Sequence, residues 1–278
     1  MRSRTTGSPY TGLRGGRQAL DPLNLTRVMP AEGETSRSFH HPPWRGVVLS
    51  MVHERAVIFA NGEVADPIAV RARLHSSDWL IAADGGLRHL QALGLAPHLL
   101  IGDMDSVDPP VREALERQGT QVLLFPADKN ETDLELALLH AQAQGARDLL
   151  VVGAFGGRLD QTLANLALLV LPELRECTTW LTDGRTDAML VRGTLRLQGN
   201  LGDGVSLLPL GEEARGVRTT GLRFPLHGET LQAYRSRGIS NEMTGPAAEI
   251  ALDSGLLVCI HSRRRANLSA SPAEGVAL

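Results

Sequence analysis

The chain has only two cysteines, Cys177 and Cys259, and they do not form a CxxC pair. This scarcity excludes a disulfide framework and a cysteine-based zinc site, and it fits a reducing cytoplasm. No run of about 18 apolar residues is present, so we expect no contact with a membrane. The formal net charge of −3 provides no global basic surface for nucleic acid. Lys129 is the only lysine in the chain, so its position deserves notice.

The first 50 residues have no sustained apolar period and are rich in Gly, Pro, Ser and Arg. Such a segment cannot bury enough apolar surface to order itself, so we predict a disordered extension over residues 1–54. The alternatives are upstream sequence translated before a true start at Met51, or a transit-like or nucleic-acid-touching tail. At the other end, we predict a flexible tail over residues 266–278.

Residues 55–184 alternate short apolar runs with amphipathic stretches. Continuous apolar runs suit parallel strands that are buried on both faces, and the intervening stretches have helical spacing. Examples are the sets Leu134, Ala137, Leu138, Ala141 and Leu163, Leu166, Ala167, Val170. The runs are AVIFANG, WLIAADGG, HLLIGDMD, QVLLFPAD, DLLVVGAFGG and CTTWLTDG. The pattern predicts an α/β domain with an open, mostly parallel sheet.

Residues 185–265 have a different pattern. Short apolar runs such as DAMLVRG, TLRLQG and GVSLLPLG are separated by Gly-rich turns, and no helix of useful length is present. Closely spaced strands of this kind are typical of an antiparallel sandwich or barrel. We therefore predict that a smaller, all-β sandwich domain follows the α/β domain.

Unusual polar residues follow the predicted parallel strands, where ligands of open α/β sheets bind. They include Asp84, Asp103, Asp105, Asp128, Lys129, Asp133, Arg158 and Asp160, with glycines among them. Asp108 is different, because Pro109 and the segment VREALERQ follow it, so we expect it to cap a helix. Neighbouring carboxylates repel one another, and a divalent cation relieves that repulsion.

Magnesium suits this arrangement, because it takes oxygen ligands and is held by one or two carboxylates together with substrate phosphates. Glycine backbone N–H groups, Lys129 and Arg158 would bind a polyphosphate. The sequence contains neither GxxxxGK[ST] nor GxGxxG, which excludes a P-loop and a standard dinucleotide site. The residues alone therefore indicate a Mg²⁺-dependent enzyme or binder of a phosphorylated ligand.

Several motifs in order, ADGG, GDMDS, KNETD and GAFGGRLDQ, followed by TTGLRFPL and GISNE, resemble the thiamine pyrophosphokinase (thiamin diphosphokinase) family. The resemblance covers about residues 55–262. It implies transfer of the pyrophosphoryl group of ATP to the hydroxyl of thiamine, giving thiamine diphosphate and AMP. It also implies a cytoplasmic homodimer with the active site between the α/β domain of one subunit and the β-rich domain of the other.

The resemblance assigns roles residue by residue. The expected metal ligands are Asp84, Asp103, Asp105 and Asp128, and the expected catalytic residues are Asp103, Asp105 and Asp133. The expected ATP and pyrophosphate contacts are Gly85, Gly86, Lys129, Asn130, Thr132, Gly157, Arg158, Asp160 and Gln161. The expected thiamine contacts are Phe224, Ser240 and Asn241. Because phosphoryl-type transfer depends on positioning and charge neutralisation, these residue types suit the reaction. Asp105 or Asp133 would accept the hydroxyl proton.

Two positions depart from the family pattern and leave alternatives open. Asn130 stands where the family commonly has Asp, and Tyr234 stands where a glycine is usual. The loss of one negative charge at Asn130 favours a nucleotide- or thiamine-binding protein without catalysis. A related pyrophosphokinase acting on another heterocyclic alcohol, such as a hydroxymethylpterin, is the second alternative. For Phe224 the competing interpretation is an ordinary core residue of the sandwich.

Overall fold

A computed structural model describes residues 53–264. Met51, most of the predicted extension at 1–54 and the predicted tail at 266–278 lie outside the described residues. The helices are α1 (Pro67–Ala72), α2 (Leu87–Ala92), α3 (Pro109–Arg117), α4 (Asp133–Ala143) and α5 (Leu159–Ala167), with short 3-10 turns η1 (Asp84–Gly86), η2 (Leu168–Val170) and η3 (Pro172–Leu174).

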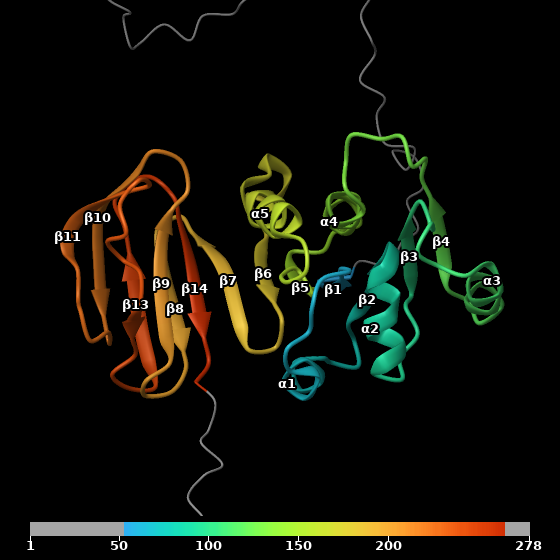
Figure 1. The fold of residues 1–278 in the computed structure, drawn as a ribbon, viewed down its shortest axis with the longest axis horizontal. Coiled ribbons are helices and arrows are strands. Elements are labelled where there is room, and N and C mark those ends of the chain that lie inside the picture. Colours follow the sequence, from blue (N-terminus) through green and yellow to red (C-terminus); the bar gives the residue numbers. More distant parts are fainter. Residues whose placement is uncertain (1–52, 265–278) are drawn as a thin grey trace, which may run out of the picture. The chain divides into compact units, whose positions relative to one another are not determined.

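Six strands form the parallel part of a ten-stranded sheet (Figure 1). They are β1 (Arg55–Phe59), β2 (Trp79–Ala83), β3 (Leu99–Gly102), β4 (Gln121–Leu124), β5 (Asp148–Val152) and β6 (Thr178–Thr182). Their order is β6-β5-β1-β2-β3-β4, and every neighbouring pair is parallel. The predicted parallel sheet is confirmed, because each apolar run becomes one of these strands.

Helices cover both faces of the parallel strands (Figure 1). Val57 and Phe59 of β1 pack in one apolar cluster with Val70 of α1, Leu90 of α2 and Leu115 of α3. Helix α4 packs against β1, β2 and β3 through the predicted apolar positions, which are buried. Strands β1, β2, β3 and β5 are thus buried on both faces, as their unbroken apolar sequences require, whereas the edge strand β4 is partly exposed.

The remaining strands are antiparallel. Strands β7 (Thr186–Val191), β14 (Leu257–Ser262), β9 (Gly204–Pro209) and β12 (Asn241–Glu242) continue the ten-stranded sheet beyond β6. A separate four-stranded sheet has the order β11-β10-β13-β8, made of β11 (His227–Gln232), β10 (Glu213–Thr220), β13 (Ala247–Ala251) and β8 (Thr194–Gln198). The predicted order of fold classes, mostly parallel α/β followed by antiparallel β, is therefore confirmed.

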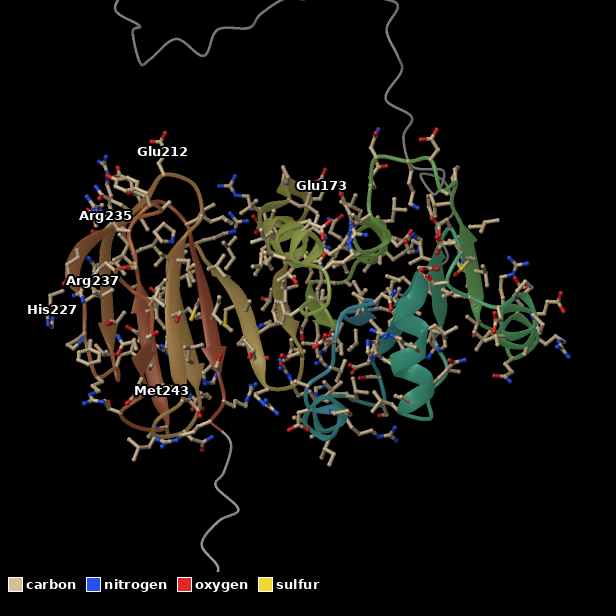
Figure 2. The ribbon with its side chains drawn as sticks, in the orientation of Figure 1. Glu173, Glu212, His227, Arg235, Arg237 and Met243 are labelled. Carbon is tan, nitrogen blue, oxygen red and sulfur yellow. The ribbon has the colours of Figure 1, made fainter. Side chains whose placement is uncertain are left out.

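One apolar core joins the two antiparallel parts. Val205 and Leu257 of the large sheet belong to the same buried cluster as Leu197 and Ile250 of the small sheet. Met243, labelled in Figure 2, is 1% exposed and belongs to this cluster too. Strands β6 and β7 pair with each other on either side of Gly184, so the sheet continues across the boundary predicted near residue 184. That boundary stays a prediction.

The sequence did not predict β11 and β12. Strand β11 is polar on both faces, and Leu231 is its one fully buried side chain, so the apolar alternation that marks a strand is missing. Helix α5 is present, but its predicted apolar face is not buried. Leu163 is 58% exposed, whereas Asn165 is buried.

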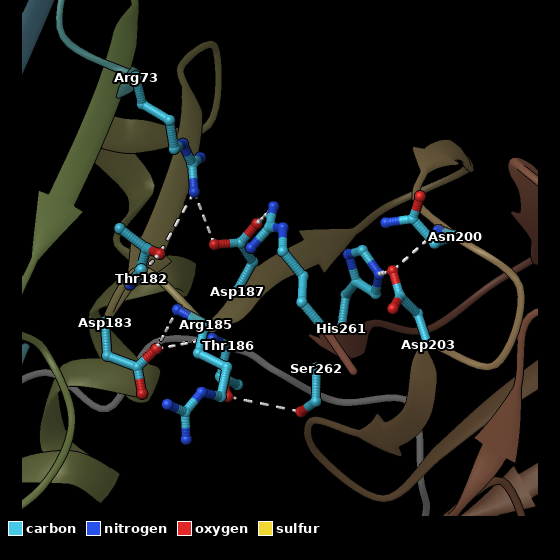
Figure 3. A network of polar contacts seen from close by, with 12 residues as sticks. Arg73, Thr182, Asp183, Arg185, Thr186, Asp187, Asn200, Asp203, His261 and Ser262 are labelled. Carbon is cyan, nitrogen blue, oxygen red and sulfur yellow. Dashed lines mark hydrogen bonds and ion pairs between the residues drawn. The ribbon is translucent and has the colours of Figure 1, made fainter. Parts of the chain in front are cut away.

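Two buried carboxylates of the antiparallel part have polar partners (Figure 3). Asp187 of β7 is fully buried and pairs with Arg73 at 2.7 Å and with Arg263 at 2.6 Å. Asp203 lies 3.1 Å from the ring of buried His261. A buried carboxylate needs such partners to offset its lost hydration. Among residues 53–264, no helix is both long and apolar enough to cross a membrane.

Candidate active site

Three carboxylates meet where β2 and β3 end. Oxygen atoms of Asp84, Asp103 and Asp105 all lie within 4.8 Å of one another. Asp84 is buried and adopts a φ of 41°, a conformation that residues other than glycine seldom adopt. Its Oδ1 atom is buried without a hydrogen-bond partner among the described residues. Such a cluster attracts cations, because each carboxylate repels the others.

Backbone geometry stabilises the charge on Asp103. The Asp105 backbone N–H donates to Asp103 Oδ1 at 3.2 Å, and this hydrogen bond lowers the pKa of the Asp103 carboxyl. Lys129 lowers it further from 3.4 Å. Asp103 is therefore ionised at neutral pH and available to a cation.

Asp133 lies beside this cluster, at the first position of α4. Thr132 caps the helix by accepting a hydrogen bond from the Glu135 N–H at 3.2 Å. Burial raises the pKa of Asp133, while Lys129 Nζ, 3.1 Å from Asp133 Oδ1, opposes the rise. Burial would lower the pKa of Lys129, but Asp133 and Asp103 raise it. The ammonium group therefore bridges two carboxylates.

Gly102 permits this close approach. A Cβ atom at Gly102 would lie 3.0 Å from the Asp84 side chain and 3.1 Å from the Asp133 carboxyl. Its φ of 148° is also one that side-chain-bearing residues rarely adopt. A larger residue at the end of β3 would therefore separate the carboxylates.

A cavity of about 430 Å³ opens beside the carboxylates. It brings together seven predicted site residues, which are Asp84, Lys129, Thr132, Asp133, Gly157, Arg158 and Gln161. Anionic and cationic side chains thus line one hollow at the carboxyl ends of the parallel strands. A phosphorylated ligand with a metal ion needs both kinds of charge.

Among the other lining residues, Asn61, Gly62 and Asn165 were missed by the sequence analysis. Asn61 and Gly62 follow β1, as the predicted residues follow other strands. Their position at a strand end could therefore have identified them as site residues. Arg88 fixes this loop by donating to both of their carbonyl oxygens, at 2.8 and 2.6 Å. Asn165 gave no signal, because it lies among the leucines of α5. Its side chain donates to the Ala154 carbonyl at 2.9 Å.

Gly85 and Gly86 have a packing role that the sequence did not indicate. A Cβ at Gly86 would lie 1.8 Å from the Phe59 carbonyl oxygen, and one at Gly85 would lie 2.4 Å from the Asn61 side chain. Both glycines are buried. The close packing of η1 against the end of β1 therefore accounts for glycine at both positions, and their phosphate contact stays a prediction.

Several predicted residues lie outside the cavity. Asp128 and Asn130 are exposed in the loop before α4, and Asp128 does not belong to the carboxylate cluster. Asp160 is exposed and pairs with Arg158 at 2.5 Å.

Asp108 stands at the N-cap of α3, as predicted, but its side chain makes no capping hydrogen bond. The expectation that this side chain caps the helix was wrong. Its backbone carbonyl accepts the first helical hydrogen bonds, and Pro109 provides the helical φ.

The predicted thiamine contacts lie together in the antiparallel part. Phe224 is 52% exposed, so it is not an ordinary core residue. The Asn241 side chain bonds both the N–H and the carbonyl of Phe224. Ser240 is exposed and has a φ of 61°. Tyr234, the unusual residue, is 74% exposed.

Two family models match this chain, one in its mostly parallel α/β part and one in its antiparallel part. Residues 70–181 match the family model "Thiamin pyrophosphokinase, catalytic domain", and residues 194–257 match "Thiamin pyrophosphokinase, vitamin B1 binding domain". The thiamine pyrophosphokinase of Bacillus subtilis is 27% identical over 184 residues, which is 66% of this chain and 86% of that protein. Thiamine pyrophosphokinase 1 of Oryza sativa is 26% identical, over 60% of this chain and 67% of that protein.

Solved structures have the same fold. The structure of the Bacillus subtilis thiamine pyrophosphokinase aligns with a TM-score of 0.68 and 23% identity, covering 75% of this chain and 99% of that one. The structure from Geobacillus thermodenitrificans aligns with a TM-score of 0.65 and 25% identity, covering 76% and 98%. With both family domains matched in order, the chain belongs to the thiamin pyrophosphokinase family of enzymes.

Proposed function

We propose that this protein transfers the pyrophosphoryl group of ATP to the hydroxyl of thiamine, giving thiamine diphosphate and AMP. The observation that carries the proposal is the cavity where Asp84 and Asp133 face Lys129 and Arg158, inside the region matched by the catalytic-domain model. The vitamin B1 binding domain that follows supports thiamine as the acceptor.

Asp84, Asp103 and Asp105 suit a divalent cation. Their oxygens are close enough to share one ion, and the buried, unpaired Oδ1 of Asp84 lacks another partner among the described residues. Hard oxygen donors of this kind favour Mg²⁺. When bound, the ion would neutralise charge on the polyphosphate. We do not assign Asp128 to this set, because it lies outside the cluster.

The side chains around the cluster supply positioning and charge. Lys129 and Arg158 would bind phosphate oxygens, and the N–H groups at the start of α4 would support them. Asp133 is our candidate for accepting the thiamine hydroxyl proton, because burial raises its pKa towards that of a more effective base. Asp105 is the alternative. Gly157, Gln161 and Asn165 would line the nucleotide side.

We propose that two copies of the chain form the complete site. Within residues 53–264, those that line the cavity all lie between Ala60 and Asn165, whereas Phe224, Ser240 and Asn241 belong to the second part of the chain. A homodimer in which one subunit offers Phe224 to the partner's cavity would join them. The aromatic ring suits the cationic thiamine through stacking and cation–π attraction. The unpaired Cys177 and Cys259 support a cytoplasmic location.

The test is an assay of the purified protein with ATP, thiamine and MgCl₂, with AMP and thiamine diphosphate separated by chromatography. We expect equal amounts of the two products and none when thiamine or the metal is left out. Product with 6-hydroxymethylpterin but not with thiamine would support the other pyrophosphokinase. Binding of thiamine and ATP without turnover would support a regulatory protein instead.

A further inference from the structure

The loop that carries Phe224 is held at both ends. Leu222 and Leu226 are buried in the sandwich core, while Arg223, Phe224 and Pro225 between them are exposed. The Phe224 ring is thus exposed at the tip of an anchored loop, with the Arg223 guanidinium 5.3 Å from its centroid, and its direction depends on the backbone of the loop tip.

The Asn241 side chain is hydrogen-bonded to that backbone. Its Oδ1 accepts hydrogen bonds from the Phe224 N–H at 3.0 Å and the Glu242 N–H at 2.9 Å, and its Nδ2 donates to the Phe224 carbonyl at 2.7 Å. These partners fix the orientation of the amide, since an oxygen in place of Nδ2 would face a carbonyl. Both acceptor sites of Oδ1 are therefore occupied inside the protein, and the residue is only 8% exposed.

The neighbouring chain holds Asn241 in place. Asn241 pairs with Val205 of β9, and the Ser240 N–H donates to the Ser206 hydroxyl at 3.1 Å. The positive φ of Ser240 turns the chain just before Asn241. The amide is thus held between strand β9 and the loop that carries Phe224.

We propose that Asn241 is a positioning residue that fixes the backbone of Phe224, so that the Phe224 ring stands ready for the thiamine ring system. This inference rests on the proposed function for the identity of the ligand. It replaces the expectation that Asn241 itself contacts thiamine. Asn241 acts through Phe224, and its loss lowers affinity for thiamine without changing the binding of ATP.

The experiment compares Asn241→Ala, the isosteric Asn241→Asp and Phe224→Ala. We expect both Asn241 variants to raise the KM for thiamine about tenfold, with kcat and the KM for ATP within about twofold of the wild type. In the Phe224→Ala background, Asn241→Ala should add nothing further. Thr120→Val is the matched control, because it removes another buried side-chain hydrogen bond, to the Pro97 carbonyl, away from the cavity.

Three results would overturn the inference. They are an equal rise of KM in the Phe224→Ala background, a fall in kcat alone, or a change that Thr120→Val reproduces. Amide hydrogen exchange at Phe224 gives a readout that needs no thiamine, and it should speed up in Asn241→Ala. If the wild type makes no thiamine diphosphate, the proposed function fails, while unchanged exchange at Phe224 would show that Asn241 does not hold the loop.

Discussion

Lys129 and Asp133 form an ion pair at the start of α4, with 3.1 Å between Nζ and Oδ1. The same ammonium lies 3.4 Å from Asp103. The only lysine of the chain therefore acts as an internal counter-ion for two carboxylates that would otherwise repel each other.

Replacing Lys129 with Gln should leave the repulsion between Asp103 and Asp133 uncompensated. We expect a lower melting temperature at pH 7, and added MgCl₂ should raise it more in the variant than in the wild type. Activity should fall at least about tenfold, because the proposed phosphate-binding site loses a positive charge. Arg112→Gln is the control, since it removes only a surface pair with Glu116. Equal responses of Lys129→Gln and wild type to MgCl₂ would contradict this role.

Asp103→Asn should reduce turnover at least about a hundredfold and leave the fold intact, because in the proposed function its charge serves the ligand and not the core. The measurement is AMP release, together with a circular-dichroism melting curve. Asp108→Asn changes the same residue type five positions further on, outside the cluster, and should behave like the wild type. Normal rates in Asp103→Asn would refute a metal-binding role.

Local patterns in the sequence predicted much of the fold. Unbroken apolar runs identified the parallel strands, and the residues following those runs included Asp84, Asp103 and Lys129 of the site. The sequence could not predict β11, because its polar residues carry no periodic signal. It also could not assign Asn165 to the cavity, because contact between α5 and the loop after β5 is a tertiary feature.

Gly86 also shows that tertiary contacts could not be predicted from the sequence. The sequence places Gly86 beside an acid at a strand end, which suggested a phosphate contact. Only the three-dimensional structure brings it against the Phe59 carbonyl. Residue type and position along a strand are thus readable from sequence, whereas the atoms that a residue meets across the fold are not.

Gly86→Ala should therefore destabilise the protein by about 2–3 kcal/mol, because the added methyl group would overlap the Phe59 backbone and force η1 away from β1. Urea denaturation measures the change. Gly193→Ala is the matched control, as no atom of residues 53–264 lies within 4 Å of an added Cβ there. If Gly86→Ala kept wild-type stability but lost ATP binding, the phosphate contact would be the better explanation.

His140 should make the protein sensitive to acid. Burial lowers its pKa from 6.5 to about 4. As the pH falls below 6.5, His140 binds a proton in the unfolded chain but not in the folded protein. The free energy of unfolding therefore falls until about pH 4. The loss amounts to at most about 3 kcal/mol.

His140→Gln should lose less stability than the wild type between pH 7 and 4.5 in urea titrations. The exposed His75 is the control, and a His75→Gln variant should keep the wild-type acid loss. Identical pH profiles for His140→Gln and wild type would contradict the prediction.

Mixing two defective subunits tests whether the active site is shared. Asp103→Asn damages the carboxylate cluster beside the cavity, and Phe224→Ala damages the loop that we propose reaches the partner's cavity. If each site combines both from different subunits, a mixed dimer has one site with both changes and one with neither. Random pairing in a co-expressed mixture should then restore about a quarter of wild-type activity at limiting thiamine.

A site built within one subunit would leave one defect in every site, so the mixture would stay as inactive as its parents. Differently tagged subunits allow the mixed dimer to be isolated, and its activity per dimer should be about half that of the wild type.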